Sequence, residues 1–386
     1  MSSPEEALNS AFKKILIDNS FSDLSIKLPK ENLTAHRAIV AVRCEEICPM
    51  PDITDKKKKI KDKSSVQIKG VTNPAIMLKV LEYIYSGSVA FPSMAPEAIM
   101  ELNKAAKHFN LRRLSFMCED FFQQNLSMSN IFAVLFAAHK LNEPTIKAFC
   151  KHFAIEHFNE LVMNTEGLHV LGIPLFQEVV TAYLTSQATG NLSKVSLGEP
   201  PADTLLNDLE RMYKLMPYAD CKFFVDGEEI ICHKAILGGW SEKFKQTVTG
   251  SSACIAINGV SKDAFKSMLK FLYYGCDEID PLPACELVGF ARTYELHDLL
   301  TVCENKIRNS IAINTVLGIL EVAYQPEMAQ KQELVQELKG KTFPFVADHF
   351  SDIDLSPLRT KMNNKSVLIA ADLLLYMQDA VKKVGH

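Results

Sequence analysis

Two copies of one domain-sized unit follow each other in this chain of 386 residues. Three residues recur at a constant offset of 197: Asp23 as Asp220, His36 as His233, and Arg37 as Lys234. Further on, the sequence LEYIYSG at 81–87 returns as LKFLYYG at 269–275, at an offset of 188. Solenoid repeats have periods of roughly 20–50 residues. A period this long therefore indicates a duplicated domain, whose function lies in the unit and in its duplication.

Hydrophobic spacing within the unit predicts helices and strands. Leu8, Phe12 and Ile15 lie on one face of a helix predicted over residues 4–17. Residues 24–28 alternate between apolar and polar side chains, as half-buried strands do. In the second copy, the Asp-Gly pair at 226–227 lies between two apolar runs and predicts a tight hairpin.

Each copy then continues in the same order. In the first copy we expect a short helix at 36–42, a short strand at 66–68, and a helix around 77–84 that ends at Gly87; the second copy has the same elements at 233–237, 255–257 and 265–272, ending at Gly275. Because strands come early and helices gather late, each unit is predicted to be an α+β head.

An all-helical segment follows each head. In the first copy, apolar stripes at 131–138 and 146–157 flank Pro144 and predict a helix hairpin. Five segments are therefore expected: a first head at 1–125, a first helical tail at 126–185, a linker at 186–202, a second head at 203–309 and a second helical tail at 310–386. The linker is predicted from its glycines, its prolines and its weak periodicity.

Composition limits the possible functions. The net charge of −4 is small, so the chain as a whole does not indicate a nucleic-acid partner. No run reaches the ~20 apolar residues that span a bilayer, and the acidic N-terminus lacks a secretory core. The ten cysteines form no C-x-x-C pair, which predicts buried reduced thiols and neither a metal site nor a disulfide framework. We therefore expect a cytoplasmic protein, also able to be nuclear, with no membrane partner.

A lysine-rich run at 56–63 is inserted in the first copy and accounts for most of the change in offset. It is typical either of a nuclear-localisation or anion-binding segment or of a solvated loop. It lacks interleaved aromatic side chains, so it does not predict nucleic-acid binding. Both alternatives stay open at the level of sequence.

Catalytic motifs are absent from the chain. It contains no G-x-S-x-G, no P-loop, no G-x-G-x-x-G and no H-E-x-x-H. His36 and His233 stand at helix starts, and no nucleophile accompanies them at a matching position in both copies. The sequence thus predicts a non-enzymatic protein with no catalytic residues and no cofactor.

The repeated motifs resemble the BTB/POZ domain. Asp23 with His36 and Arg37, and the LEYIYSG sequence at 81–87, carry the resemblance together with their second-copy equivalents. The tails resemble the BACK domain, and the order BTB-BACK-BTB-BACK resembles the C-terminal half of leucine-zipper-like transcriptional regulator proteins. The resemblance implies an α+β head, a helical tail and a role in protein association.

The resemblance also implies two kinds of site. Dimerisation through the first helix and the pocket around the aspartate and histidine gives these residues: Leu8, Phe12, Ile15, Asp23, His36, Arg37, Asp220, His233 and Lys234. Many BTB domains also hold cullin-3 through a hydrophobic-x-Glu motif. Here the corresponding loop holds aspartates in the first copy and no acid in the second, and the contact residues it implies are Met50, Asp52, Ile53, Asp55 and Phe244.

The expected function is a protein-interaction scaffold that serves as an adaptor for a cullin-3-type ubiquitin ligase and recruits an unknown protein. The alternative is a self-associating structural or transcription-linked scaffold that binds no cullin. Duplication raises one further hypothesis, namely that the two heads pair within one chain. For the acid–base pairs, a structural ion pair within one head and a role at an interface are both open.

Overall fold

A computed structural model of the chain describes residues 4–51, 65–190, 195–250, 254–324, 332–354, 356 and 364–384. It divides the chain into two compact units. One unit is Phe21–Asp208, and the other joins Met1–Ser20 to Leu209–His386. Each unit contains one α+β head and one helical tail, as the duplicated sequence predicts.

The first head is built on a three-stranded sheet. Strand β1 (Leu24–Lys27) lies between β2 (Asn32–Ala35), which is antiparallel to it, and β3 (Ser65–Gln67), which is parallel. Leu24 and Ile26 are buried while Lys27 is exposed, which confirms the alternation expected for a half-buried strand.

Helices cover this sheet and extend beyond it. They are α2 (Arg37–Arg43), α3 (Pro74–Ser86), α4 (Pro96–His108) and α5 (Arg112–Asn125). The side chain of Asn73 caps α3 by accepting a hydrogen bond from the backbone N–H of Ala75. Gly87 ends α3 with φ of 67°, a left-handed conformation that glycine adopts without strain.

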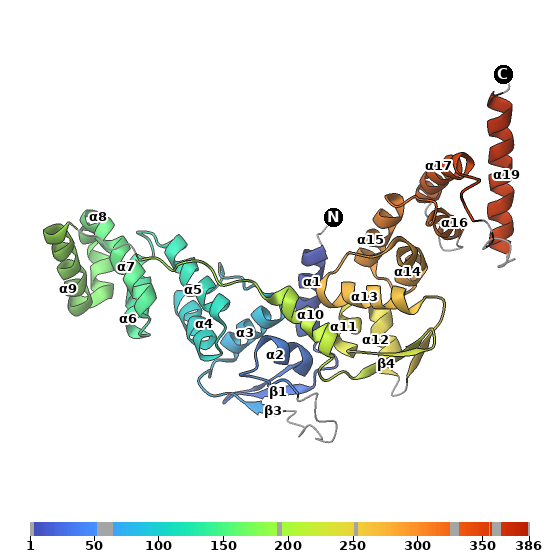
Figure 1. Cartoon of the computed structure of the whole chain (residues 1–386). Helices are drawn as coiled ribbons and strands as arrows, with labels where there is room; N and C mark the ends of the chain where they lie inside the picture. Colours follow the sequence, from blue (N-terminus) through green and yellow to red (C-terminus); the bar gives the residue numbers. More distant parts are fainter. Residues whose placement is uncertain are drawn as a thin grey trace. The chain divides into compact units, whose positions relative to one another are not determined.

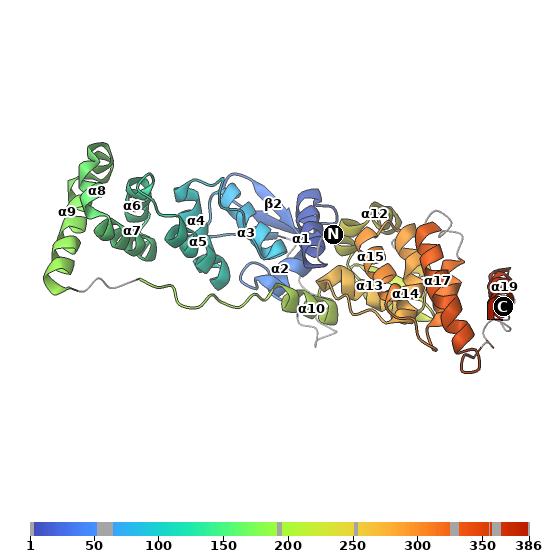
Figure 2. The same ribbon diagram turned by 90° about the horizontal axis from the view of Figure 1, so that it is seen from above.

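The first tail contains α6 (Ile131–Lys140), α7 (Pro144–Glu156), α8 (Phe158–Met163) and α9 (Thr165–Thr189). Figure 2 shows these four helices beyond the pair α4 and α5 of the same unit. Helices α6 and α7 form the hairpin that Pro144 predicts, and α9 packs against both. Because α9 continues to Thr189, the irregular linker begins later than the expected residue 186.

A buried polar network joins the first head to its tail. The side-chain amide of Asn103 donates to Glu119 at 3.2 Å and to Glu143 at 3.0 Å. Lys107 Nζ lies 2.8 Å from the Glu119 carboxylate and 3.2 Å from that of Glu143. Since Glu143 directly precedes α7, one lysine and one amide hold two carboxylates, one from the head and one from the tail.

Helix α9 departs from the expectation that no segment is long and apolar enough to span a membrane. By length and composition this helix could span a membrane, and 17% of its most apolar 18-residue stretch is buried inside the protein. The helix is kinked at Gly172, where φ is 69° and ψ is 166°. Near its middle, Glu178 pairs with Lys147 at 2.8 Å and with Lys151 at 2.7 Å. These ion pairs to α7 and the buried positions on α9 assign it to the tail.

The second head repeats the first. Strand β4 (Cys221–Val225) lies between β5 (Glu228–Cys232) and β6 (Ile255–Ile257) with the same pairing directions. Asp226 and Gly227 connect β4 to β5 with φ of 49° and 84°, as a tight hairpin turn requires. Its helices are α11 (Lys234–Trp240), α12 (Glu242–Thr249), α13 (Lys262–Tyr274), α14 (Pro281–Thr293) and α15 (His297–Arg308).

The second tail contains α16 (Val316–Ala323), α17 (Gln332–Asp348) and α19 (Asn364–Val384). Its core gathers side chains from these helices and the segment after α17: Val316, Leu320, Phe343, Val346, Ile353, Ile369 and Leu373. Among the residues that the structure describes, the regular elements of this tail are all helices, which agrees with the sequence-based expectation.

All ten cysteines are free thiols, and eight of them are buried. Burial raises the pKa of the Cys44, Cys150, Cys285 and Cys303 thiols to about 12. The burial of these eight side chains agrees with the expectation that the cysteines contribute to packing.

Candidate functional site

The first helix of the chain does not pack on the first head. Helix α1 (Pro4–Asp18) belongs to the unit of the second head and lies against α11 and α13, as Figure 1 shows. Leu8, Phe12 and Ile15 are buried, with exposed fractions of 0%, 1% and 3%. We call the surface of the second head formed by α11 and α13 the second seat.

Two glycines of the second seat face α1, and at one of them, Gly239, the approach is close enough to exclude a side chain. A β-carbon added at Gly239 would come within 2.1 Å of Ile15 Cγ1, closer than real contacts allow. At Gly275, it would lie 3.7 Å from Leu8 Cδ2. Gly239 is therefore the place where the α1 side chain enters the head, a role that the sequence did not reveal.

An ion pair holds the end of α1. Lys245 Nζ of α12 lies 2.7 Å from Asp18 Oδ2. The hydrogen bond from Lys245 lowers the pKa of Asp18 below its ordinary value of 3.8. The same hydrogen bond raises the pKa of Lys245. The pair favours the docked α1 over the pH range where both groups are charged.

The first head holds a different segment, the start of α10 (Leu205–Leu215) and the residues before it. Leu205 is 4% exposed, and its Cδ2 atom lies 3.2 Å from the position of a β-carbon added at Gly87. Leu205 corresponds to Leu8 at the offset of 197, and Gly87 corresponds to Gly275 at the offset of 188. We call this surface of the first head the first seat.

Arg43 dominates the first seat. Its Nη1 atom donates to Asp208 at 2.7 Å and to the Thr204 hydroxyl at 3.0 Å. Its Nε atom donates to the Ile84 carbonyl at 3.1 Å. Only 4% of the Arg43 side chain is exposed, so the guanidinium depends on these partners.

A second arginine fixes the segment before α10. Arg113 Nη1 donates to the Pro201 carbonyl at 2.6 Å, and its Nη2 atom lies 3.4 Å from Asp203. Asp203 in turn accepts from the backbone N–H of Leu205 at 3.0 Å. The segment from Pro201 to Leu205 is thus tied to α5 of the first head.

Helix α1 and the start of α10 are therefore grouped with the head that lies farther along or earlier in the chain, while α10 from Leu209 onward stays in the unit of the second head, where the Tyr213 ring lies 5.5 Å from that of Tyr273. Residues Met1–Ser20 precede the first head but belong to the unit of the second, while the residues up to Asp208 precede the second head but belong to the unit of the first. The expected head boundaries of 1–125 and 203–309 follow the order of the sequence, and they stay a prediction. Hydrophobic periodicity identified the apolar face of α1, but it carries no information about which head that face contacts.

The predicted acid–base pairs lie at the start of α2 and α11. Asp23 accepts from the Arg37 backbone N–H at 2.8 Å and from its Nε atom at 2.7 Å. Asp220 accepts from the Lys234 backbone N–H at 2.8 Å. In both heads the aspartate satisfies the first N–H groups of a helix, which is a structural contact within the head.

Both predicted pocket histidines are buried, with His36 3% and His233 4% exposed. The backbone N–H and Nδ1 of His36 both meet the Tyr85 hydroxyl, at 2.9 and 2.7 Å. His233 makes the same two contacts with Tyr273, at 2.9 and 2.7 Å. In each head the tyrosine hydroxyl accepts from the backbone N–H and also meets the ring nitrogen, so each histidine is held by contacts within its own head.

The residues predicted to contact a cullin separate into three groups. Met50 is half-buried at the end of the segment after α2. Asp52, Ile53 and Asp55 lie outside the described residues. Phe244 is 0% exposed and stacks on Tyr294 with ring centroids 4.1 Å apart, so the structure corrects its assignment as a contact residue. It lies on the buried face of α12, a helix the sequence analysis did not predict.

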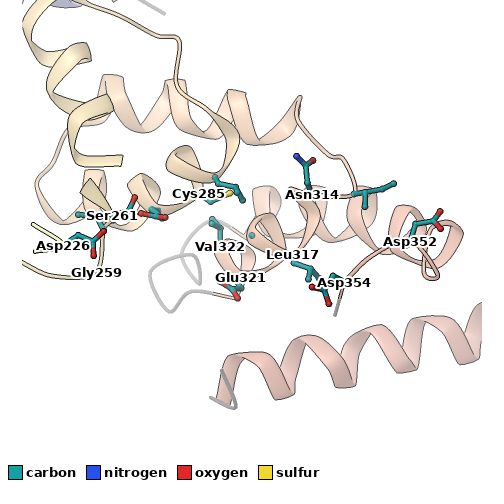
Figure 3. Close-up of a pocket in the computed structure, with 15 residues that line it drawn as sticks. Asp226, Gly259, Ser261, Cys285, Asn314, Leu317, Glu321, Val322, Asp352 and Asp354 are labelled. Carbon is teal, nitrogen blue, oxygen red and sulfur yellow. Dashed lines mark hydrogen bonds between the residues drawn. The ribbon is translucent and has the colours of Figure 1, made fainter. Parts of the chain in front are cut away.

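A cavity of about 940 Å³ lies where the second head meets the second tail. Asp226 and Ser261 line it from the head, and Glu321, Asp352 and Asp354 line it from the tail (Figure 3). One further lining carboxylate, Glu286, accepts from the Ser261 backbone N–H at 2.6 Å. Within the described residues no group of three histidine, cysteine or acidic side chains is arranged to hold a metal ion.

Two exposed apolar faces occur on the tails. On α9 they include Val170, Ile173 and Leu184, which are 46%, 74% and 61% exposed. On α19 the exposed stripe consists of Val367, Leu368, Leu374 and Leu375, each more than 50% exposed. Such patches are typical of contacts with other proteins.

Several known proteins are similar in sequence to this chain. Leucine-zipper-like transcriptional regulator 1 from Homo sapiens is 24% identical over 315 residues, covering 76% of this chain and 36% of that protein. Its Drosophila melanogaster homolog is 24% identical over 285 residues, covering 69% and 29%. TD and POZ domain-containing protein 2 from Mus musculus is 27% identical over 163 residues, covering 40% and 43%. The chain thus spans about a third of the first of these relatives.

The BTB/POZ domain itself matches twice, at residues 12–126 and 209–311, which together make up more than half of the chain. These two ranges contain the sheets, the histidine–tyrosine pairs and both seats. The chain belongs to the BTB/POZ domain family.

Proposed function

We propose that this protein is an adaptor of a cullin-3-type ubiquitin ligase whose two BTB heads are paired within one chain. BTB domains mediate self-association and bind protein partners, and the chain is a protein-interaction scaffold of this family. The adaptor role adds a specific ligase partner, cullin-3, and pairing of the two heads within one chain. An unidentified recruited protein completes the assembly. By holding this protein, the adaptor raises its local concentration at the ligase.

The exchange of helix segments is the observation that carries this proposal. Each seat is occupied by a segment of the same chain: α1 in the second seat and residues 203–208 in the first. An apolar helix face such as that of Leu8, Phe12 and Ile15 would favour dimerisation if it were exposed. Because it is already buried, the heads need no second copy to satisfy it.

Two features support the cullin partner. The tails follow the heads directly, as they do in BTB adaptors with BACK tails, and they expose apolar faces on α9 and α19. Met50 is half-buried at the start of the loop in which the family carries its cullin-contact motif. The aspartates of that loop in place of the family's glutamate favour the alternative function, a self-associating scaffold without a cullin partner.

Calorimetric titration of the full chain with the N-terminal domain of cullin-3 tests the adaptor role. We expect submicromolar binding that is weakened by Met50→Ala. The matched control is Met163→Ala, which removes a methionine that is 81% exposed on the first tail. An absence of binding at high protein concentration would contradict the adaptor role and leave the self-associating scaffold.

A further inference from the structure

We propose that the two seats discriminate by charge and by shape between α1 and the segment 203–208 at the start of α10, so that a first head pairs with a second head and not with another first head. The inference rests on the proposed pairing within the chain and adds the residues that select it. The selection uses differences between the two copies at positions that correspond by the offset of 197.

Charge selects the segment of the first seat. The Arg43 side chain is 4% exposed, and its guanidinium is neutralised by Asp208 at 2.7 Å. Helix α1 carries Ala11 at the position where α10 carries Asp208. If α1 entered the first seat, it would leave a buried cation without its carboxylate, which is strongly unfavourable.

The second seat lacks the cation. Trp240 stands where the first seat has Arg43, and its Nε1 atom donates to the Leu272 carbonyl at 2.8 Å. Arg43 Nε makes the equivalent bond to the Ile84 carbonyl. The indole thus reproduces the backbone contact without the charge, so a helix bearing Asp208 would find no cation in this seat.

Shape is a second reason why α1 does not fit the first seat. In the second seat, Gly239 leaves room for Ile15, and even one added carbon would come within 2.1 Å of Ile15 Cγ1. The corresponding residue of the first head is the branched Val42, which is 5% exposed. Ile15 therefore has no room at the first seat in the geometry it adopts at the second.

Together these differences form a code in which each wrong pairing meets an unfavourable element. Specificity of this kind depends on repulsive features as much as on attractive ones. Two first heads from separate chains could not exchange α1 helices, whereas one first head and one second head can exchange theirs. Duplication followed by divergence at Ala11, Val42, Arg43 and Asp208 would convert a dimerising domain into a self-contained pair.

The test transfers the carboxylate and the open space that select each segment to the other segment and seat. In the chain of 386 residues, the triple variant A11D/V42G/D208A gives α1 the carboxylate that Arg43 requires, opens the place of Val42 and removes the carboxylate from α10. Its molar mass is read by light scattering over a range of concentrations, beside wild type and the single variant Ala11→Asp. We expect the triple variant to rise from 43.1 kDa toward twice that mass, while the other two stay at 43.1 kDa.

A triple variant that stays at single-chain mass with wild-type thermal stability would overturn the code. If it fails to fold, charge reversal decides: R43E and D208K should each lower the unfolding temperature, and the double variant should restore it. A double variant no better than its single variants combined would also overturn the proposal. If the wild-type chain is itself a dimer, the pairing within one chain is contradicted. The charge-reversal variants would still test whether Arg43 and Asp208 select the segment of the first seat.

Discussion

Ile15 of the first helix lies directly over Gly239 of the second head, with room for hydrogen and nothing larger. Residues more than two hundred positions apart thus form one close contact, and the contact belongs to the second unit alone. This relationship shows how the chain uses its duplication: the apolar face that precedes the first head is buried by the second.

Gly239→Val should therefore loosen α1. Forcing a branched side chain against Ile15 is expected to destabilise the second unit by about 1–3 kcal/mol, the usual cost of overpacking. Chemical denaturation of the full chain measures this change. Gly340→Val is the matched control, because nothing lies within 4 Å of a β-carbon at Gly340. Equal effects of the two variants would contradict the close approach at Gly239.

The histidine–tyrosine pair can be tested twice in one molecule. Tyr273→Phe removes the hydroxyl that meets the His233 backbone N–H and ring, leaving two buried polar groups without this partner. We expect a loss of about 1–3 kcal/mol in the stability of the second unit. Tyr85→Phe should have the same effect on the first unit, since its contacts with His36 match in length.

Tyr183→Phe provides the control for these two variants, because its ring stacks on Phe158 and phenylalanine preserves that contact. A similar loss in all three variants would indicate that the hydroxyl groups of the pairs carry no special role.

Lys107 should matter more than its partly exposed position indicates. It holds both Glu119 and Glu143, whose side chains are only 12% and 3% exposed. Lys107→Met leaves two carboxylates close together without their cation, and we expect a cost of about 1–3 kcal/mol after screening by solvent. Lys79→Met, which breaks the surface pair with Glu82, should cost less than about 0.5 kcal/mol. Comparable urea midpoints for the two variants would refute the network.

Acid should release α1. The hydrogen bond from Lys245 lowers the pKa of Asp18, so docking stabilises its charged form. This contribution is fully present above the ordinary value of 3.8 and is lost as the pH falls through the lower value of the folded state. The wild-type chain should therefore lose more stability between neutral and acid pH than Asp18→Asn does. Parallel pH curves for the two proteins would show that this pair does not contribute.

Sequence predicted the heads well because local patterns determine them. The strands, the Asp226–Gly227 turn and the glycine ends of α3 and α13 follow from periodicity and from backbone conformations that few residues adopt. The face of Leu8, Phe12 and Ile15 was also evident. Its partner was not, because an apolar stripe predicts burial without naming the surface that buries it.

The residues of the seats were missed for the same reason. Arg43 and Asp208 are 165 positions apart, and no spacing rule connects them. The signal that could have found them is the comparison of the two copies, in which Trp240 replaces Arg43 and Ala11 replaces Asp208 together. Phe244 illustrates a second limit: with Val248, four positions later, it forms the buried face of α12, and a resemblance to a contact loop does not reveal this burial.

The central claim is that the two BTB heads are paired within one chain through exchanged helices. Light scattering of the full chain over a wide concentration range tests it most directly. We expect a constant mass of 43.1 kDa at every concentration. A stable mass of twice that value, abolished by Gly239→Val, would show that α1 is exchanged between chains and would contradict the claim.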